Sequence, residues 1–149
     1  MRLALYQPDI PQNTGTILRL AACLDVTVDI IGPTGFDMTD RALRRSGMDY
    51  LRHVEIVRHI SFNEFLNTLD GSRLVLLSTH AEKSHVEFEF KKTDVLMLGR
   101  ESSGAPEEVH NIAEERVAIP MKKNLRSLNI AIAAAMVLGE ALRQTDGFS

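Results

Sequence analysis

Three segments of the sequence place polar side chains beside the proline and glycine residues of tight turns. The first is PQNTGTILR, in which Pro11 and Asn13 suit a turn and a helix N-cap, while Gly15 leaves the first helical turn open. Arg19 stands between two leucines, where a guanidinium is costly unless an anion or a hydrogen-bonding group meets it. The alternative is an arginine that extends to water.

The second segment is DVLMLGRESSGAPEEV, an apolar strand followed by a turn with two glycines and a helix opened by Pro106. Ligands of open α/β sheets gather at the carboxyl ends of strands. The segment matches neither GxxxxGK[ST] nor GxGxxG, and Glu107 and Glu108 in the first helical turn would repel a phosphate. We therefore expect a ligand with little negative charge, or else an ordinary glycine turn.

The third segment, RVAIPMKKNLRSLN, joins a strand that ends at Pro120 to an apolar helix. Asn124 or Ser127 can cap this helix and leave backbone N–H groups free for a carboxylate or an adenine edge. Asn129 at the head of the helix is either a capping residue or a ligand contact.

The charge balance argues against broad attraction to polyanions, because 17 Lys and Arg residues face 20 Asp and Glu residues. Nucleic-acid contacts would then come from local basic clusters, whose alternative role is that of solvated surface. These clusters comprise Arg41, Arg44, Arg45, Lys122, Lys123 and Arg126.

The histidines lack the spacing of metal ligands, and the one cysteine, Cys23, lies in an apolar run that predicts a buried thiol. We expect no metal.

Short apolar runs alternate with helical patterns, which predicts an α/β fold with a mostly parallel sheet flanked by helices. The expected strands are 2–7, 28–32, 53–57, 73–78, 94–99 and 116–120. The expected helices are 13–24, 39–47, 61–69, 106–113 and 127–144. We expect residues 1–149 to form a single domain, without a membrane span or a signal peptide, in the cytoplasm.

The last predicted helix is apolar on every side over LNIAIAAAMVL. Such a helix is covered on both flanks, and a sheet of this size covers one. The sequence therefore predicts a homodimer through this helix, the alternative being a helix sandwiched within one chain.

Taken in order, PQNTGTILR, LMLGRESSG and IPMKKNLRSLN resemble the three motifs of the SPOUT class of RNA methyltransferases. The length of the chain resembles that of the small tRNA (cytidine/uridine-34)-2′-O-methyltransferases, which modify the wobble ribose of certain leucine tRNAs. The resemblance implies S-adenosylmethionine as the cofactor, a tRNA substrate, a homodimer and a C-terminal trefoil knot. Alternatives are another tRNA position or rRNA, or a non-catalytic nucleotide- or RNA-binding α/β domain.

The resemblance also implies roles for individual residues. Cofactor contacts fall on Leu77, Gly99, Ile119, Met121, Ser127 and Leu128. The polar signature of the catalytic site falls on Asn13, Arg19, Glu101 and Asn129, with Ser127 shared between the two sets. Arg19 is the residue usually assigned to catalysis, either as the base or as an anchor for a neighbouring phosphate. The sequence departs from its relatives at Gly139, where many carry an aromatic residue.

Overall fold

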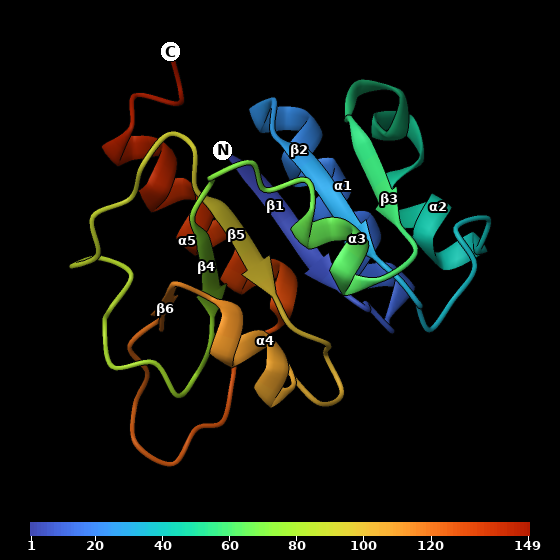
Figure 1. The fold of residues 1–149 in the computed structure, drawn as a ribbon. Helices are drawn as coiled ribbons and strands as arrows, with labels where there is room; N and C mark the ends of the chain where they lie inside the picture. Colours follow the sequence, from blue (N-terminus) through green and yellow to red (C-terminus); the bar gives the residue numbers. More distant parts are fainter.

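The computed structural model describes residues 1–149, apart from the side chains of residues 47 and 48. All strand pairs are parallel, in the order β3-β2-β1-β5-β4-β6 (Figure 1). The strands are β1 (Arg2–Tyr6), β2 (Thr27–Ile31), β3 (Ile56–His59), β4 (Leu74–Leu77), β5 (Val95–Leu98) and β6 (Glu115–Val117). The helices are α1 (Pro11–Leu24), α2 (Arg41–Gly47), α3 (Phe62–Leu66), α4 (Glu107–Ile112) and α5 (Ile130–Gln144), with a 3-10 helix, η1 (Met48–His53). The predicted α/β class and parallel sheet are confirmed.

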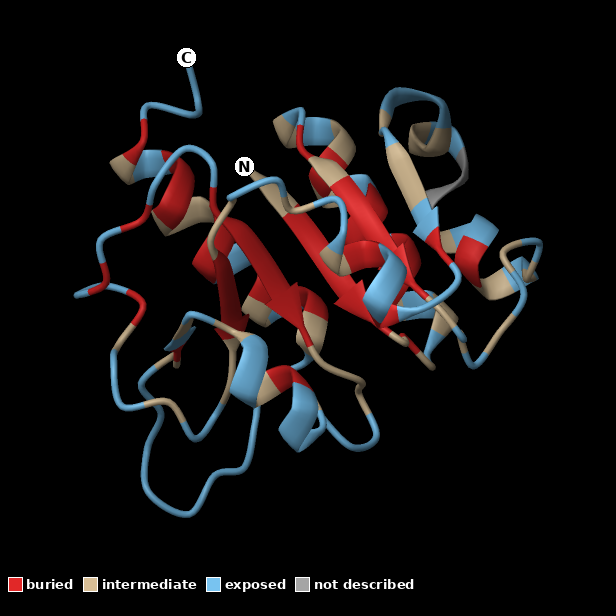
Figure 2. Cartoon of the chain, viewed as in Figure 1, coloured by how far each residue is buried: buried red, intermediate tan, exposed pale blue. Residues whose placement is uncertain are grey.

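Side chains of the central strands point alternately to two cores, one on each face of the sheet. Leu3 and Leu5 of β1 pack in the core that α1 and α5 cover, whereas Ala4 and Tyr6 pack in the core that α3 and α4 cover. Figure 2 shows the central strands as a continuous buried layer. Within the described residues, no helix has the length and apolarity needed to cross a membrane.

Helix α1 buries one side against the sheet and leaves the other in solvent. Its N-cap is Ile10, with Pro11 in the first turn, so the prediction of Asn13 as the N-cap is wrong. Cys23 lies on the outer side and is exposed. The prediction of a buried thiol is therefore wrong, because the apolar run contributes to the core only at helical spacing.

Strand β3 begins three residues later than expected, because residues 48–53 form η1. The strand extends instead to His59, which is buried with its Nε2 atom 2.8 Å from Oδ1 of Asp29 in β2. A search for apolar runs does not detect a buried polar pair, which explains why the strand was predicted too early in the sequence.

Helix α5 begins at Ile130 because Asn129 caps it: the Asn129 Oδ1 atom accepts from the backbone N–H groups of Ala131 and Ile132. The capping role considered for Asn129 is confirmed, and that of Asn124 or Ser127 is wrong. One side of α5 is buried in the core, but Ile132 is 53% exposed and Met136 is 42% exposed. The alternative of a helix sandwiched within one chain is therefore wrong.

Candidate functional site

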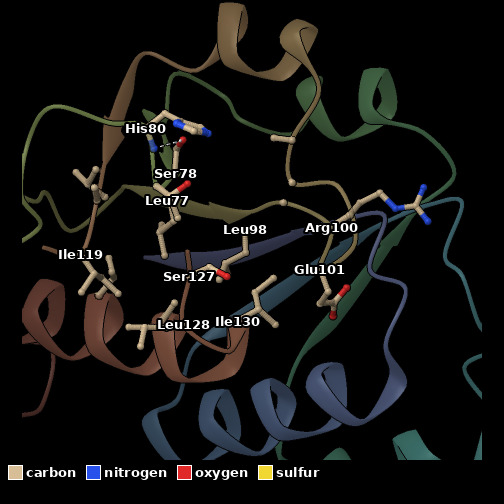
Figure 3. Close-up of a pocket in the computed structure, with 18 of the residues that line it drawn as sticks. Leu77, Ser78, His80, Leu98, Arg100, Glu101, Ile119, Ser127, Leu128 and Ile130 are labelled. Atoms are coloured by element: carbon tan, nitrogen blue, oxygen red, sulfur yellow. Dashed lines mark hydrogen bonds between the residues drawn. The ribbon is translucent and has the colours of Figure 1, made fainter. Parts of the chain in front are cut away.

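A cavity of about 640 Å³ opens where β4, β5 and β6 end, between their loops and α5. Its inner wall is apolar, with Leu77 and Leu98 at the ends of their strands and Ile130 at the start of α5 (Figure 3). Polar side chains, among them Ser127 and Glu101, stand around this wall. The volume is that of a site for a small molecule, and its position at the strand ends is the usual one in a parallel sheet.

The structure brings together all six residues expected to contact a cofactor. They come from the end of β4, from the loop after β5 and from the segment between β6 and α5. The cavity is lined by Leu77, Gly99, Ile119, Met121, Ser127 and Leu128.

Gly99 is required by the turn after β5. Arg100 and Gly104 exchange backbone hydrogen bonds of 3.0 and 2.8 Å, which folds the loop back on itself. A Cβ atom at Gly99 would lie 2.5 Å from the backbone N of Ala105 and from the backbone C of Gly104. Any side chain at this position would therefore displace the loop that forms the cavity edge.

Asn13 and Asn129 join the two helices beside the cavity. The Asn129 Nδ2 atom donates to the Asn13 Oδ1 atom at 3.0 Å, while the Asn129 Oδ1 atom caps α5. Both residues line the cavity. This pair fixes the start of α1 relative to the start of α5, which the sequence separates by more than a hundred residues.

Glu101 and Asp9 form a pair of interacting carboxyl groups at the same edge. The Glu101 Oε2 atom accepts from the backbone N–H of Asp9 at 3.0 Å, and Ser102 donates its hydroxyl to the Asp9 carboxylate. Burial raises the pKa of Glu101, and the interaction of its side chain with the Asp9 carboxyl group raises it further, against the lowering effect of the Asp9 backbone N–H. The interaction between the two carboxyl groups lowers the pKa of Asp9, and Ser102 and Arg100 lower it further. Asp9 is thus the ionised partner and Glu101 the one that keeps its proton longer.

This pair predicts an effect of Glu101→Gln on stability. Because folding raises the pKa of Glu101 above 4.5, its contribution to stability is complete below pH 4.5 and is lost as the pH rises through the folded pKa. Glutamine imitates the protonated acid, so the variant should keep this contribution. Near neutral pH we expect the free energy of unfolding of the variant to exceed that of the wild type by less than about 1 kcal/mol, since solvent screens a half-buried group.

The measurement is the free energy of unfolding of wild type and variant between pH 4 and 8. Glu87→Gln, at an exposed carboxylate, serves as the control. If the free energies of unfolding of wild type and Glu101→Gln changed with pH in the same way, Glu101 would not be the carboxyl group that keeps its proton longer.

Arg19 lies outside the lining of the cavity in its own chain. It is on the exposed side of α1, where its Nη2 atom donates to the Tyr50 hydroxyl at 3.3 Å. The basic clusters also lie outside the lining, and the two groups are on opposite sides of the molecule (Figure 1). One group is on α2, and the other is in the loop between β6 and α5. Within one chain they do not gather around a single cleft.

Sequence reasoning missed Asp9, and it gave no role to His80 and His110, which line the cavity. Asp9 lies 92 residues from Glu101, and no local spacing indicates that they meet. Among the side chains that the structure describes, no group of three His, Cys, Asp or Glu residues could hold a metal ion.

Known proteins resemble the chain over most of its length. Residues 1–139 match the SpoU rRNA Methylase family. A tRNA (cytidine(34)-2′-O)-methyltransferase of Beijerinckia indica subsp. indica is 58% identical over 95% of this chain and 90% of its own. The enzyme of the same name from Escherichia coli K12 is 37% identical over 97% of this chain and 93% of its own.

Solved structures share the fold. One, described as giving structural insights into the 2-OH methylation of C/U34 on tRNA, has a TM-score of 0.93 and 42% identity, and covers 96% of this chain and 94% of its own. The SpoU methyltransferase AviRb from Streptomyces viridochromogenes, in complex with the cofactor AdoMet, has a TM-score of 0.89 and 28% identity. That match covers 97% of this chain and 60% of AviRb.

Proposed function

The chain belongs to the SpoU rRNA methylase family of the SPOUT class, and we propose that it transfers a methyl group from S-adenosylmethionine to the ribose 2′-hydroxyl of cytidine or uridine 34 in tRNA. The main support is the strand-end cavity, whose lining contains every residue that the motifs assign to the cofactor. Two relatives that match this chain over 90% and 96% of their own length are named tRNA (cytidine(34)-2′-O)-methyltransferases. Transfer of a tritiated methyl group into tRNA would distinguish this enzyme from a non-catalytic RNA- or nucleotide-binding domain.

The residues present fit S-adenosylmethionine. Leu77, Ile119 and Leu128 offer an apolar surface to the adenosine, and Gly99 lets the backbone of the loop after β5 form the cavity edge without a side chain. The cofactor carries no phosphate, which suits a described lining whose charged side chains are Glu101 and an arginine, Arg100, that is already paired with Asp9. When bound, it supplies an electrophilic methyl group.

We expect S-adenosylmethionine to bind in the micromolar range without added metal and ATP to bind far more weakly. Gly99→Ala should lower the affinity for S-adenosylmethionine at least about tenfold. The added methyl group overlaps backbone atoms, and repacking around it costs about 1–3 kcal/mol. Gly139→Ala is the control, since a Cβ there meets nothing within 4 Å. Calorimetry in which ATP binds more tightly than the methyl donor would overturn the proposal.

The residues of the chain must hold the ribose oxygen in line with the methyl group and ease the loss of its proton. Asn13, Glu101 and Asn129 lie at the cavity and can orient the ribose. Arg19 either accepts the proton briefly or binds the adjacent phosphate in a bidentate way. Because Arg19 lies outside the cavity lining of its own chain, its role requires one of two arrangements. Either a second chain places its cavity beside the exposed side of α1, or Arg19 holds the RNA backbone while the ribose lies at the cavity of the same chain.

The path of the chain supports a trefoil knot formed by the C-terminal part. Strand β6 pairs at the far edge of the sheet, beyond β4, yet α5 packs on β5 and α1 in the middle. Residues 118–129 must therefore cross back beside the loops that follow β4 and β5. We also propose that residues 1–149 form a single methyltransferase domain, since the strands belong to one sheet.

A homodimer through α5 is the further part of the proposal. Ile132 and Met136 leave an apolar stripe exposed on this helix, close to Leu128 at the cavity. Covering the stripe with a second copy would remove this surface from water. Since the substrate is tRNA, we propose the cytoplasm as the place of action.

Binding of tRNA should weaken as salt rises despite the excess of acidic residues. The exposed arginines of α2 are free to contact phosphates, and each contact contributes about 0.7–0.9 to the slope of log affinity against log salt. The double variant Arg44→Ala/Arg45→Ala should make the affinity depend less steeply on salt. Lys83→Ala, at a lysine paired with Glu115, should leave the salt dependence unchanged. A slope near zero in the wild type would refute phosphate contacts as the main attraction.

A further inference from the structure

The side chain of Arg19 is held by an aromatic ring. Its guanidinium carbon lies 4.5 Å from the centroid of the Tyr50 ring, and its Nη2 atom donates to the Tyr50 hydroxyl at 3.3 Å. Among the ion pairs of the described side chains, none includes Arg19. Arg19 is exposed, and the contacts described for its guanidinium are the cation–π contact and the hydrogen bond with Tyr50.

This mode of contact matters for an arginine that is to meet an anion or a hydroxyl. A carboxylate would orient the guanidinium but also neutralise its charge, whereas an aromatic face attracts the cation through its quadrupole and leaves the charge intact. One hydrogen bond to the phenol uses one of five N–H donors, so the others remain available.

The fold places Tyr50 for this contact. It belongs to η1, which packs on α1 together with α2, and its ring is half-buried. Arg44 and Arg45 are exposed on α2, the helix that contacts both α1 and η1. Arg19 is thus anchored at the junction of three elements, on the side of α1 where the arginines of α2 would draw in a phosphate backbone.

We propose that Tyr50 is a positioning residue for methyl transfer, which orients the Arg19 guanidinium toward the substrate. The inference rests on the proposed function of Arg19. Without the ring, four side-chain torsions of an exposed arginine are free, and the productive orientation becomes one among many.

The test compares Tyr50→Leu, which removes the aromatic face, with Tyr50→Phe, which keeps it. Tyr50→Leu should lower kcat about tenfold and leave the KM for S-adenosylmethionine unchanged, while Tyr50→Phe should stay within about threefold of wild type. The thermal melt and cofactor affinity of each variant show that the fold is intact. If the leucine variant fails this check, Tyr50→Met, which fills the same space with a flexible chain, takes its place.

A double-mutant cycle separates a positioning role from a structural one. If Tyr50 acts through Arg19, then Tyr50→Leu should cause no further loss of single-turnover rate in the Arg19→Ala background. Additive losses would overturn the proposal, as would a Tyr50→Leu variant with wild-type kcat beside a slow Arg19→Ala variant. Wild-type turnover in Arg19→Ala would instead refute the catalytic role of Arg19, and the role of Tyr50 with it.

Discussion

Arg19→Ala should lower the turnover of methyl transfer by about a hundredfold or more, which corresponds to about 2.7 kcal/mol of transition-state stabilisation. Its affinity for S-adenosylmethionine should stay within a few fold of wild type, because Arg19 lies outside the cavity lining. Its stability should change little, since the side chain is exposed and contacts Tyr50 alone among the described aromatic rings. Single-turnover rates and calorimetry measure the two effects separately.

Arg19→Lys distinguishes the two roles held open for the arginine. Lysine keeps the charge but loses the planar fork, so a bidentate phosphate anchor should fail in both variants. A role as proton acceptor should survive in part in Arg19→Lys, because an amine loses its proton more readily than a guanidinium. Arg58→Ala, at an exposed arginine of β3 outside the cavity lining, controls for the loss of a surface charge. Near wild-type turnover in both Arg19 variants would make Arg19 a structural residue.

A carboxylate on the exposed stripe of α5 should dissociate the dimer without unfolding the chain. Ile132→Glu and Met136→Glu each place a charge where the proposed interface is apolar, and an unpaired buried charge costs several kcal/mol. We expect light scattering at tens of micromolar to give the mass of two chains for wild type and of one chain for the variants. Methyl transfer should fall with dissociation if the partner helps to form the site.

Two further variants control this experiment. Ile60→Glu adds the same charge at an isoleucine that is 86% exposed away from α5, and should leave the dimer intact. Ala134→Glu is unsuitable, because Ala134 is fully buried in its own chain and a charge there should unfold the protein. A wild-type mass of one chain at these concentrations would refute the dimer.

The apolar patterning of the sequence predicts most of the fold. Each expected strand and helix has a counterpart in the structure, because a parallel sheet buried on both faces requires continuous apolar strands such as LVLL and VLML. The motifs likewise predict which residues line the cavity, from Leu77 to Leu128. These features depend on local sequence and on a family pattern that the chain retains.

The contacts that tune the site are not predictable in this way. Asp9 meets Glu101 across 92 residues, and Arg19 meets Tyr50 across 31. Such pairs depend on where the turns and η1 bring the backbone, and polar residues in loops carry no periodic signal. For the same reason, apolar counting placed Cys23 in the core, whereas the helical phase of α1 turns it to solvent.

Mapping of the methylated nucleoside tests the central claim most directly. The protein is incubated with S-adenosylmethionine and unmodified total tRNA, and the product is digested and sequenced by mass spectrometry, with Arg19→Ala as the matched control. We predict one methyl group on the ribose 2′-oxygen of cytidine or uridine 34, present with wild type and strongly reduced with the variant. A methyl group on a base or at another position, or none in tRNA, would contradict the account.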